Sequence, residues 1–181
     1  MTYTATFLSL ERATKVGSLV PLAPLDGAAQ VRSLHVTPEI RDLLSGANPQ
    51  SGLPTWLSDP LIGRFLVGQC VWVCLSKEPV RKVDVDLKRL VGAGEIWTLR
   101  FASVRKRING WRIFGMFLHF NCFVGLRACA RDALRTADDW MRTIEETKHD
   151  WTRVLTPDAP LSSDRLDAYL SEPYRDVTAS Y

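Results

Sequence analysis

The chain has 181 residues, of which 46% are hydrophobic and 24% charged, and its formal net charge is +3 at pH 7. This length and composition predict one globular domain with appendages, or at most two small domains. No apolar run approaches the roughly 20 residues that a membrane-spanning helix needs, and we identify no secretion signal. We therefore expect a cytoplasmic protein without a membrane partner.

The first 60 residues are predicted to form an N-terminal extension with one short helix. Thr2–Leu10 is rich in β-forming residues, which favours a strand. Thr37 as the N-cap residue and Pro38 at the first helical position predict the short helix. Residues 46–60 contain three prolines and two glycines, which is typical of a loop. We expect the boundary to the main domain in this loop.

Residues 61–150 are predicted to form an α+β core. Leu61–Gly68 predicts a short helix, Gln69–Ser76 a buried strand and Asp84–Val91 a short strand or turn of helix. Three β-like segments with short connections then predict an antiparallel meander. These segments are Glu95–Ser103, Gly110–Leu118 and Asn121–Arg127.

A helix is expected over Ala130–Lys148, because apolar residues recur there at helical spacing. Residues 151–181 are predicted to form an acidic C-terminal helical segment with a last helix at Asp164–Ser171 and a frayed tail. The expected fold is thus α+β, with an antiparallel β-sheet core flanked by helices and with extensions at both ends.

Charge is unevenly distributed along the chain. Residues 81–135 carry 12 Lys and Arg against 4 Asp and Glu, whereas residues 136–181 carry 5 basic and 10 acidic residues. A basic surface concentrates polyanions, so nucleic acid or an acidic protein is the expected partner. We also expect the acidic residues of 156–181 to shield part of this basic surface.

The sequence predicts neither a metal site nor a cofactor. The four cysteines form no C-x-x-C pair and have no His at ligand spacing, so we interpret them as thiols in a reducing compartment. Asp84 and Asp86 would share one face of a strand, but two carboxylates without a third are more typical of a solvated surface.

The order of motifs in the core resembles the RelE/ParE toxin superfamily, nearest its HigB-like branch. The chain reads G-E-I-W-T-L-R-F, a basic loop, G-W-R-I-F-G-M-F, F-V-G-L-R and then a helix, over about residues 88–148. The family has a W-x-L-R-type strand, a strand with an aromatic-Arg pair, a strand reading roughly F-V-K-K and a helix with a polar start. The paired lysines of the family's third strand are replaced here by Gly125-Leu126-Arg127.

The resemblance implies a toxin of a toxin–antitoxin system that cleaves mRNA, either at the ribosome or free. Cleavage by attack of a 2′-OH needs positive groups around the transition state, and guanidinium groups supply fixed charge and bidentate geometry. The candidate catalytic residues are Arg100, Arg112, His119, Arg127 and Arg131. Arg127 and Arg131 are expected near the end of the third strand and the start of the helix, where an anion can also contact the helix N-terminus.

Nucleic-acid contacts are expected from Arg105, Lys106, Arg107 and Arg135. Trp97 and Trp111 could stack on bases, although a Trp in a strand more often belongs to the core. For the arginines, the alternative interpretation is that they form ion pairs with Glu95, Asp132 or the acidic C-terminal segment.

Enzymatic activity stays open at this point. The alternatives are a non-enzymatic binder of the same fold that inhibits a host protein, as ParE-like members do, and a phage or plasmid accessory protein that binds nucleic acid without cutting it. A further alternative is an assembly protein whose basic block pairs with its own acidic C-terminus. RNA or the ribosome, and a cognate antitoxin with an acidic or amphipathic segment, are the expected partners.

Overall fold

The computed structural model describes residues 3–24, 27–47, 53, 55–75, 85–90, 92–101 and 110–177, with side chains from residue 8 onward. The described helices are α1 (Tyr3–Lys15), α2 (Pro38–Leu44), α3 (Thr55–Leu66) and α4 (Ala137–Leu155), with 3-10 turns at Arg131–Ala133 and Leu166–Ala168. The described strands are β1 (Val20–Leu22), β2 (Ser33–Val36), β3 (Val71–Cys74), β4 (Leu87–Arg89), β5 (Trp97–Phe101), β6 (Trp111–His119), β7 (Cys122–Ala130) and β8 (Tyr174–Asp176).

These strands form one sheet in the order β1-β2-β7-β6-β5-β4-β3-β8. Neighbours from β4 to β7 are antiparallel, which confirms the predicted meander. However, β2 pairs in parallel with β7, and β3 pairs in parallel with both β4 and β8. The protein is α+β as expected, but the sheet is mixed, so the prediction of a purely antiparallel core is wrong.

Two of the three missed parallel pairs join segments that are distant in the sequence. Ser33 pairs with Cys122, and Val71 pairs with Tyr174. Parallel strands cannot be joined by a tight turn, so the turn spacing that predicts hairpins carries no information about them. As a result, β1 and β2 from the first 60 residues and β8 near the C-terminus lie in the same sheet as the central strands.

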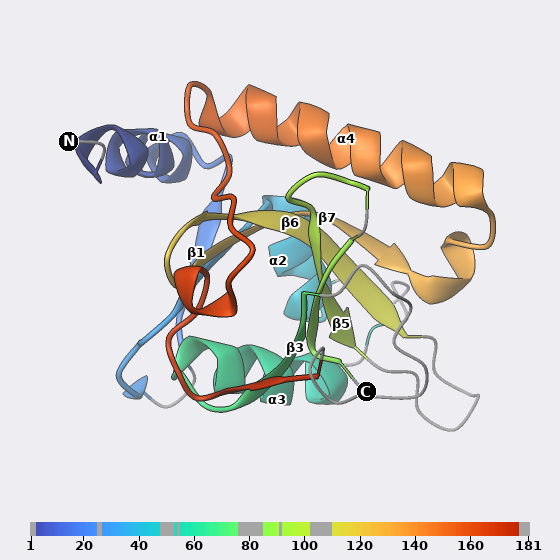
Figure 1. Ribbon diagram of the computed structural model, residues 1–181, viewed down its shortest axis with the longest axis horizontal. Coiled ribbons are helices and arrows are strands. Elements are labelled where there is room, and N and C mark those ends of the chain that lie inside the picture. Colours follow the sequence, from blue (N-terminus) through green and yellow to red (C-terminus); the bar gives the residue numbers. More distant parts are fainter. Residues whose placement is uncertain are drawn as a thin grey trace.

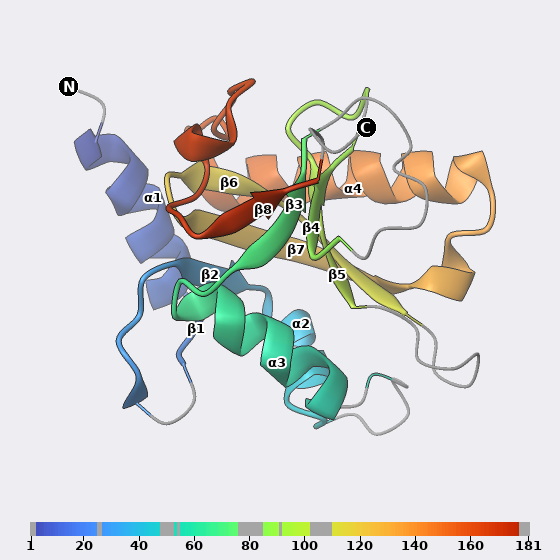
Figure 2. The same cartoon turned by 60° about the horizontal axis from the view of Figure 1, so that its bottom comes forward.

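Helices cover both faces of the sheet (Figures 1 and 2). On one face, α1 and α4 pack over a core that includes Leu10, Ile144 and Trp151. On the other face, α2 and α3 pack over a second core that includes Ile40 and Phe65. Alternate residues of each central strand enter these two cores, because successive side chains point to opposite faces.

The two ends of the chain differ from the sequence predictions. Residues 3–15 are helical rather than extended, and Leu10 and Ala13, three positions apart, are both buried in the core beneath α4. Only a 3-10 turn forms at Leu166–Ala168, and the tail after Pro173 contributes β8. Tertiary contacts outweigh the local propensities in both places.

A β-bulge between Phe114 and Gly115 in the β6–β7 pair determines which residues face one another from Phe114 back to the start of β6. Gly115 lies opposite Gly125, whereas Phe114 lies opposite Arg127 and Arg112 opposite Cys129. A Cβ atom at Gly115 would approach the Val124 carbonyl oxygen to 2.0 Å, so glycine is needed for this close approach. The bulge adds a residue to β7 and so sets the register of the arginines.

The described part of the chain contains no helix that is long and apolar enough to cross a membrane.

Candidate nucleic-acid interface

Three arginines meet where β5 ends, β6 begins and β7 ends. Arg100 and Arg112 lie directly opposite each other on β5 and β6. Their neighbours Leu99 and Ile113 enter the core under α2 and α3, so the two arginines lie on the sheet face that α4 covers. Arg131 follows β7 directly and its backbone N–H donates to the Gly110 carbonyl at 2.7 Å. We call Arg100, Arg112 and Arg131 the arginine face.

The surroundings of Arg112 disfavour its charged form. Burial, and to a smaller extent the neighbouring charges of Arg100 and Arg131, together lower the pKa of Arg112 to about 10. Its guanidinium lies 5.4 Å from the ring centroid of Trp140, the first aromatic residue of α4. A cation–π contact offsets part of the cost of holding the charge there. Gathered like charges of this kind are stabilised by a bound anion.

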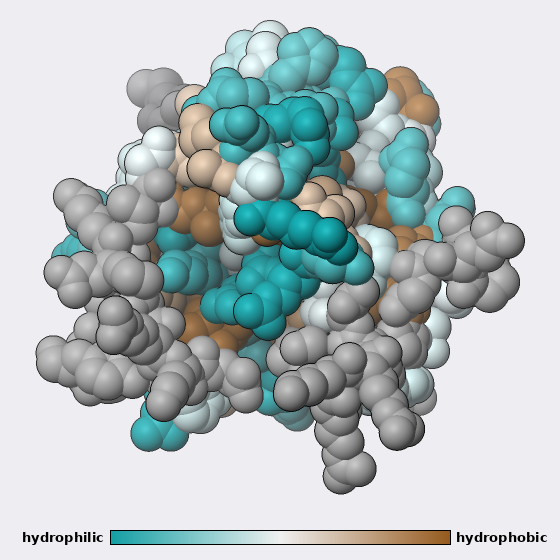
Figure 3. Space-filling model, turned by 90° about the vertical axis from the view of Figure 1, so that its right-hand side faces the viewer, coloured by the Kyte–Doolittle hydropathy of each residue, from teal (hydrophilic) through white to brown (hydrophobic). Residues whose placement is uncertain are grey.

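Part of the surface on this side of the molecule is hydrophilic (Figure 3). Figure 3 looks onto the end of the molecule where β5 ends and α4 begins, and hydrophilic side chains gather across the centre of that view. Lys88 of β4 also points to the α4 side, because it lies opposite Thr98 and alternates with buried Leu87. Neither Lys88 nor Trp140 was expected at this site from the sequence, since only the sheet register and the docking of α4 bring them to the same sheet face as the arginines.

The predicted combination of Arg131 with a helix N-terminus is wrong. Arg131 begins a 3-10 turn, and α4 starts six residues later at Ala137. The N-terminus of α4 is already occupied by a capping box between Thr136 and Asp139. Arg131 and Arg135 are exposed, and the Nε–H of Arg135 donates to the Asp132 carbonyl at 2.7 Å.

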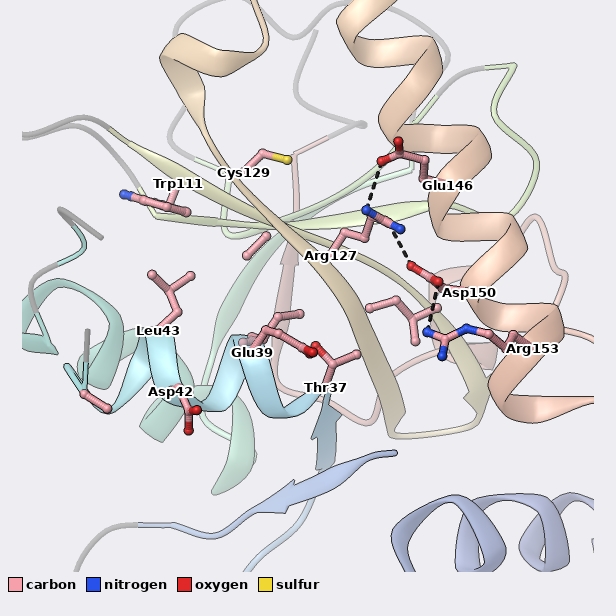
Figure 4. A pocket seen from close by; sticks show the side chains of 14 residues that line it. Thr37, Glu39, Asp42, Leu43, Trp111, Arg127, Cys129, Glu146, Asp150 and Arg153 are labelled. Carbon is pink, nitrogen blue, oxygen red and sulfur yellow. Dashed lines mark hydrogen bonds and ion pairs between the residues drawn. The ribbon is translucent and has the colours of Figure 1, made fainter. Parts of the chain in front are cut away.

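Arg127 does not belong to the arginine face. Its guanidinium reaches α4, with NH1 2.9 Å from Glu146 and Nε 2.8 Å from Asp150, the latter an ion pair rather than an aligned hydrogen bond (Figure 4). The side chain of Asp150 is only 10% exposed, and it also pairs with Arg153 at 3.1 Å. Arg127 therefore forms ion pairs, but with Glu146 and Asp150 of α4 rather than with the expected Glu95, Asp132 or acidic C-terminal segment. The expectation that it forms one phosphate site with Arg131 is wrong.

His119 lies at the far end of β6 from Arg112. Seven positions of extended strand separate the two residues, which is roughly 24 Å. His119 lies near His35, whose pKa is lowered by burial and then by the charge of His119. The expectation that His119 lies near the basic face is wrong, because the long β6 strand places its two ends on opposite sides of the molecule.

Two described acids of the C-terminal segment, Asp158 and Asp164, contact residues outside the arginine face. Asp164 pairs at 3.4 Å with Arg89, which points to the opposite sheet face from Lys88. Asp158 accepts a hydrogen bond from Ser9. Tyr169 is fully buried and β8 completes the sheet, so this segment is part of the folded core rather than a removable cover.

The remaining predicted residues divide into three groups. Arg105, Lys106 and Arg107 lie outside the described residues, as does Asp84. Trp97 is fully buried and Trp111 packs against the core under α2 and α3, so both belong to the core. Asp86 accepts a hydrogen bond from the Trp72 backbone N–H at 2.9 Å and pairs with Arg64.

The described residues contain no group of three His, Cys, Asp or Glu side chains that could hold a metal ion. All four cysteines are free thiols.

Comparisons with known proteins give no relative: no protein-family model, no curated protein and no solved structure matches this chain.

Proposed function

We propose that this protein is a toxin of the RelE/ParE type that binds RNA through its arginine face, at the ribosome or on free mRNA. The observation that carries the proposal is the convergence of Arg100, Arg112 and Arg131 at one end of the sheet. RNA phosphates neutralise such a cluster, and binding releases the counterions that surround the RNA. Guanidinium groups also present the forked donors that suit phosphate oxygens.

The order of the motif-bearing elements supports the toxin assignment. The W-x-L-R segment forms β5, the segment with the aromatic-Arg pair forms β6, the F-V segment forms β7, and α4 follows. This is the succession that the resemblance to the RelE/ParE superfamily implies. On this proposal, a cognate antitoxin would cover the arginine face with an acidic or amphipathic segment, and the protein would act in the cytoplasm.

RNA cleavage is the second candidate function. Three guanidinium groups near one phosphate could stabilise the charge that develops during 2′-OH attack. With His119 at the other end of β6, a cleaving mechanism would depend on charge and on orientation of the substrate rather than on this histidine as a base. RNA binding is therefore the activity that we place first.

Binding is tested with a fluorescent single-stranded RNA, titrated at several salt concentrations. The Arg131→Ala variant should bind several-fold more weakly and reduce the slope of log K against log salt by about 0.7, the value for one single-strand phosphate contact. Arg165→Ala is the matched control, because Arg165 is an exposed arginine of the C-terminal segment paired with Asp167. Equal behaviour of both variants would exclude the arginine face as the RNA site.

Toxicity and cleavage are tested separately. Expression in a bacterial host should slow growth in the wild type and not in an Arg112→Gln, Arg131→Ala double variant. Incubation of the purified protein with ribosomes and mRNA shows whether the RNA is cut. Growth arrest with intact RNA would favour the non-enzymatic binder, and normal growth with wild-type protein would contradict the toxin proposal.

A further inference from the structure

A second surface lies between α2 and α4, along the last part of β7 (Figure 4). It is a groove of about 800 Å³. Four consecutive residues of β7 line it, from Leu126 to Cys129. Because alternate side chains of a strand point to opposite faces, four neighbours can all border one groove only where it runs along the edge of the strand.

This edge of β7 is open in the described structure. On that side β7 pairs with β2, but the register ends at Val36 opposite Gly125. One last hydrogen bond follows, from the Thr37 N–H to the Gly125 carbonyl at 3.3 Å. The chain then turns into α2, and no described strand pairs with residues 126–130 on this side. Unpaired strand edges are templates for the addition of another strand.

The charge of the groove is opposite to that of the arginine face. Its lining contains four carboxylates, from Glu39, Asp42, Glu146 and Asp150, against the two guanidinium groups of Arg127 and Arg153. Both arginines already pair with Asp150. Asp42 is paired at 2.6 Å with Arg41, which lies outside the lining. The remaining small excess of negative charge, from Glu39 and Glu146, favours a cationic ligand over phosphate.

The groove also offers apolar surface on the α2 side. Leu43 of α2 and Trp111 of β6 line it there, and Glu39 lies in the first turn of α2. On the α4 side the lining is polar and includes Glu146. A strand added to the β7 edge would point alternate side chains toward these two different environments.

We propose that the open edge of β7 binds an extended segment of a partner protein that carries alternating apolar and basic side chains. Backbone hydrogen bonds to β7 provide the affinity, and the two walls of the groove select the side chains. Basic side chains meet Glu146 on the α4 side, and apolar side chains pack against Leu43 and Trp111 on the α2 side. Glu39, at the α2 wall, adds to the negative charge of the groove. This site is distinct from the arginine face and does not depend on the RNA-binding proposal.

The probe is a fluorescein-labelled decapeptide of alternating valine and lysine, measured by anisotropy at low salt. We expect saturable binding, and no binding of a valine–glutamate peptide of the same length. A valine–lysine peptide with every second amide N-methylated should also fail, because it cannot complete the backbone hydrogen bonds. Equal binding of the N-methylated peptide, or no binding of the valine–lysine peptide, would overturn the proposal.

Matched variants locate the site. Glu146→Gln should weaken peptide binding about two- to fivefold, the range for exposed ion pairs, whereas its neighbour Glu145→Gln should not. Glu145 lies outside the groove and pairs with Lys148. Because Glu146 also pairs with Arg127, Glu39→Gln is the second variant, with exposed Glu11→Gln of α1 as its control. If Glu39→Gln and Glu146→Gln weaken peptide binding no more than their control variants do, the groove is not the binding site.

A second copy of the chain is the competing occupant of this edge. Sedimentation equilibrium should show a monomer whose mass does not change when the peptide is added. A dimer that the peptide dissociates would assign the β7 edge to self-association and would overturn the proposal of a separate basic partner.

Discussion

The arginine face and the groove beside β7 both border α4 but have opposite electrostatic character. On the arginine face, Arg112 is held close to two other arginines, and burial together with these like charges lowers its pKa. In the groove, Arg127 from the same basic block is neutralised by Glu146 and Asp150 of α4. A basic stretch of sequence therefore does not become one basic surface, because the register and α4 divide it.

The difference determines what each region can bind. Like charges that converge leave a site that an anion stabilises, whereas paired charges with additional carboxylates leave a site for a cation. The two regions are nevertheless close, since Arg112 lies opposite Cys129, a residue that lines the groove.

The largest effect is expected from removing the arginine face as a whole. A variant with Arg100→Gln, Arg112→Gln and Arg131→Gln should lose RNA affinity on the order of 10²-fold at low salt, and its salt slope should fall by about 2, for three phosphate contacts. The thermal unfolding temperature should change little, because the substitutions remove mutual repulsion as well as the contact of Arg112 with Trp140. Unchanged RNA affinity would mean that the convergence of these arginines has no ligand-binding role.

The next largest effect concerns Arg127 and is a loss of stability. Arg127→Ala leaves the largely buried carboxylate of Asp150 with Arg153 as its remaining partner, and should cost about 1–3 kcal/mol. This is below the value for a fully buried pair because the Arg127 side chain is 37% exposed. Chemical denaturation measures the loss, and RNA affinity of the folded variant should change less than about twofold. If the variant loses much RNA affinity but keeps full stability, Arg127 contributes to RNA binding together with the arginine face.

A smaller effect is expected in the reactivity of Cys129. Burial raises the pKa of its thiol, so less thiolate is present at pH 8 than for a thiol of ordinary pKa. Alkylation by iodoacetamide should therefore be several-fold slower at Cys129 than at exposed Cys70, and the difference should shrink as the pH rises. The valine–lysine peptide should slow the reaction of Cys129 further and leave Cys70 unchanged, as mass spectrometry of the labelled peptides can measure.

The smallest effect is the coupling between the two regions. RNA and the valine–lysine peptide should bind together, and saturating RNA should change the Kd of the peptide by less than about twofold. Titration of the peptide into the preformed RNA complex measures this coupling. Strict competition between RNA and the peptide would show that the two surfaces form one site.

The sequence predicted the local parts of the fold well. The meander of β5, β6 and β7 was predicted because alternating segments are joined by turn residues within a few positions. The helix at Pro38 was predicted for the same kind of reason, since Thr37 and Pro38 form a start signal that acts over one turn. The start of α4 was placed seven residues early, because β7 continues to Ala130.

The candidate site was predicted less well than the strands that carry it. Arg100, Arg112 and Arg131 were named from the sequence, and the structure brings them together. Arg127 and His119 were named with them but lie elsewhere, for two different reasons. The acids that bind Arg127 come from α4, and the length of β6 moves His119 away from Arg112.

By itself the sequence determined the α+β class, the central meander and the concentration of basic residues within it, because these depend on neighbours within a few positions. Tertiary structure alone decided that β2 and β8 join the sheet in parallel with distant strands and that β7 keeps an open edge beyond Gly125. It also decided which arginines meet one another and which meet α4. These features depend on long-range pairing and helix docking, where residues far apart in the chain become neighbours only after the core has formed.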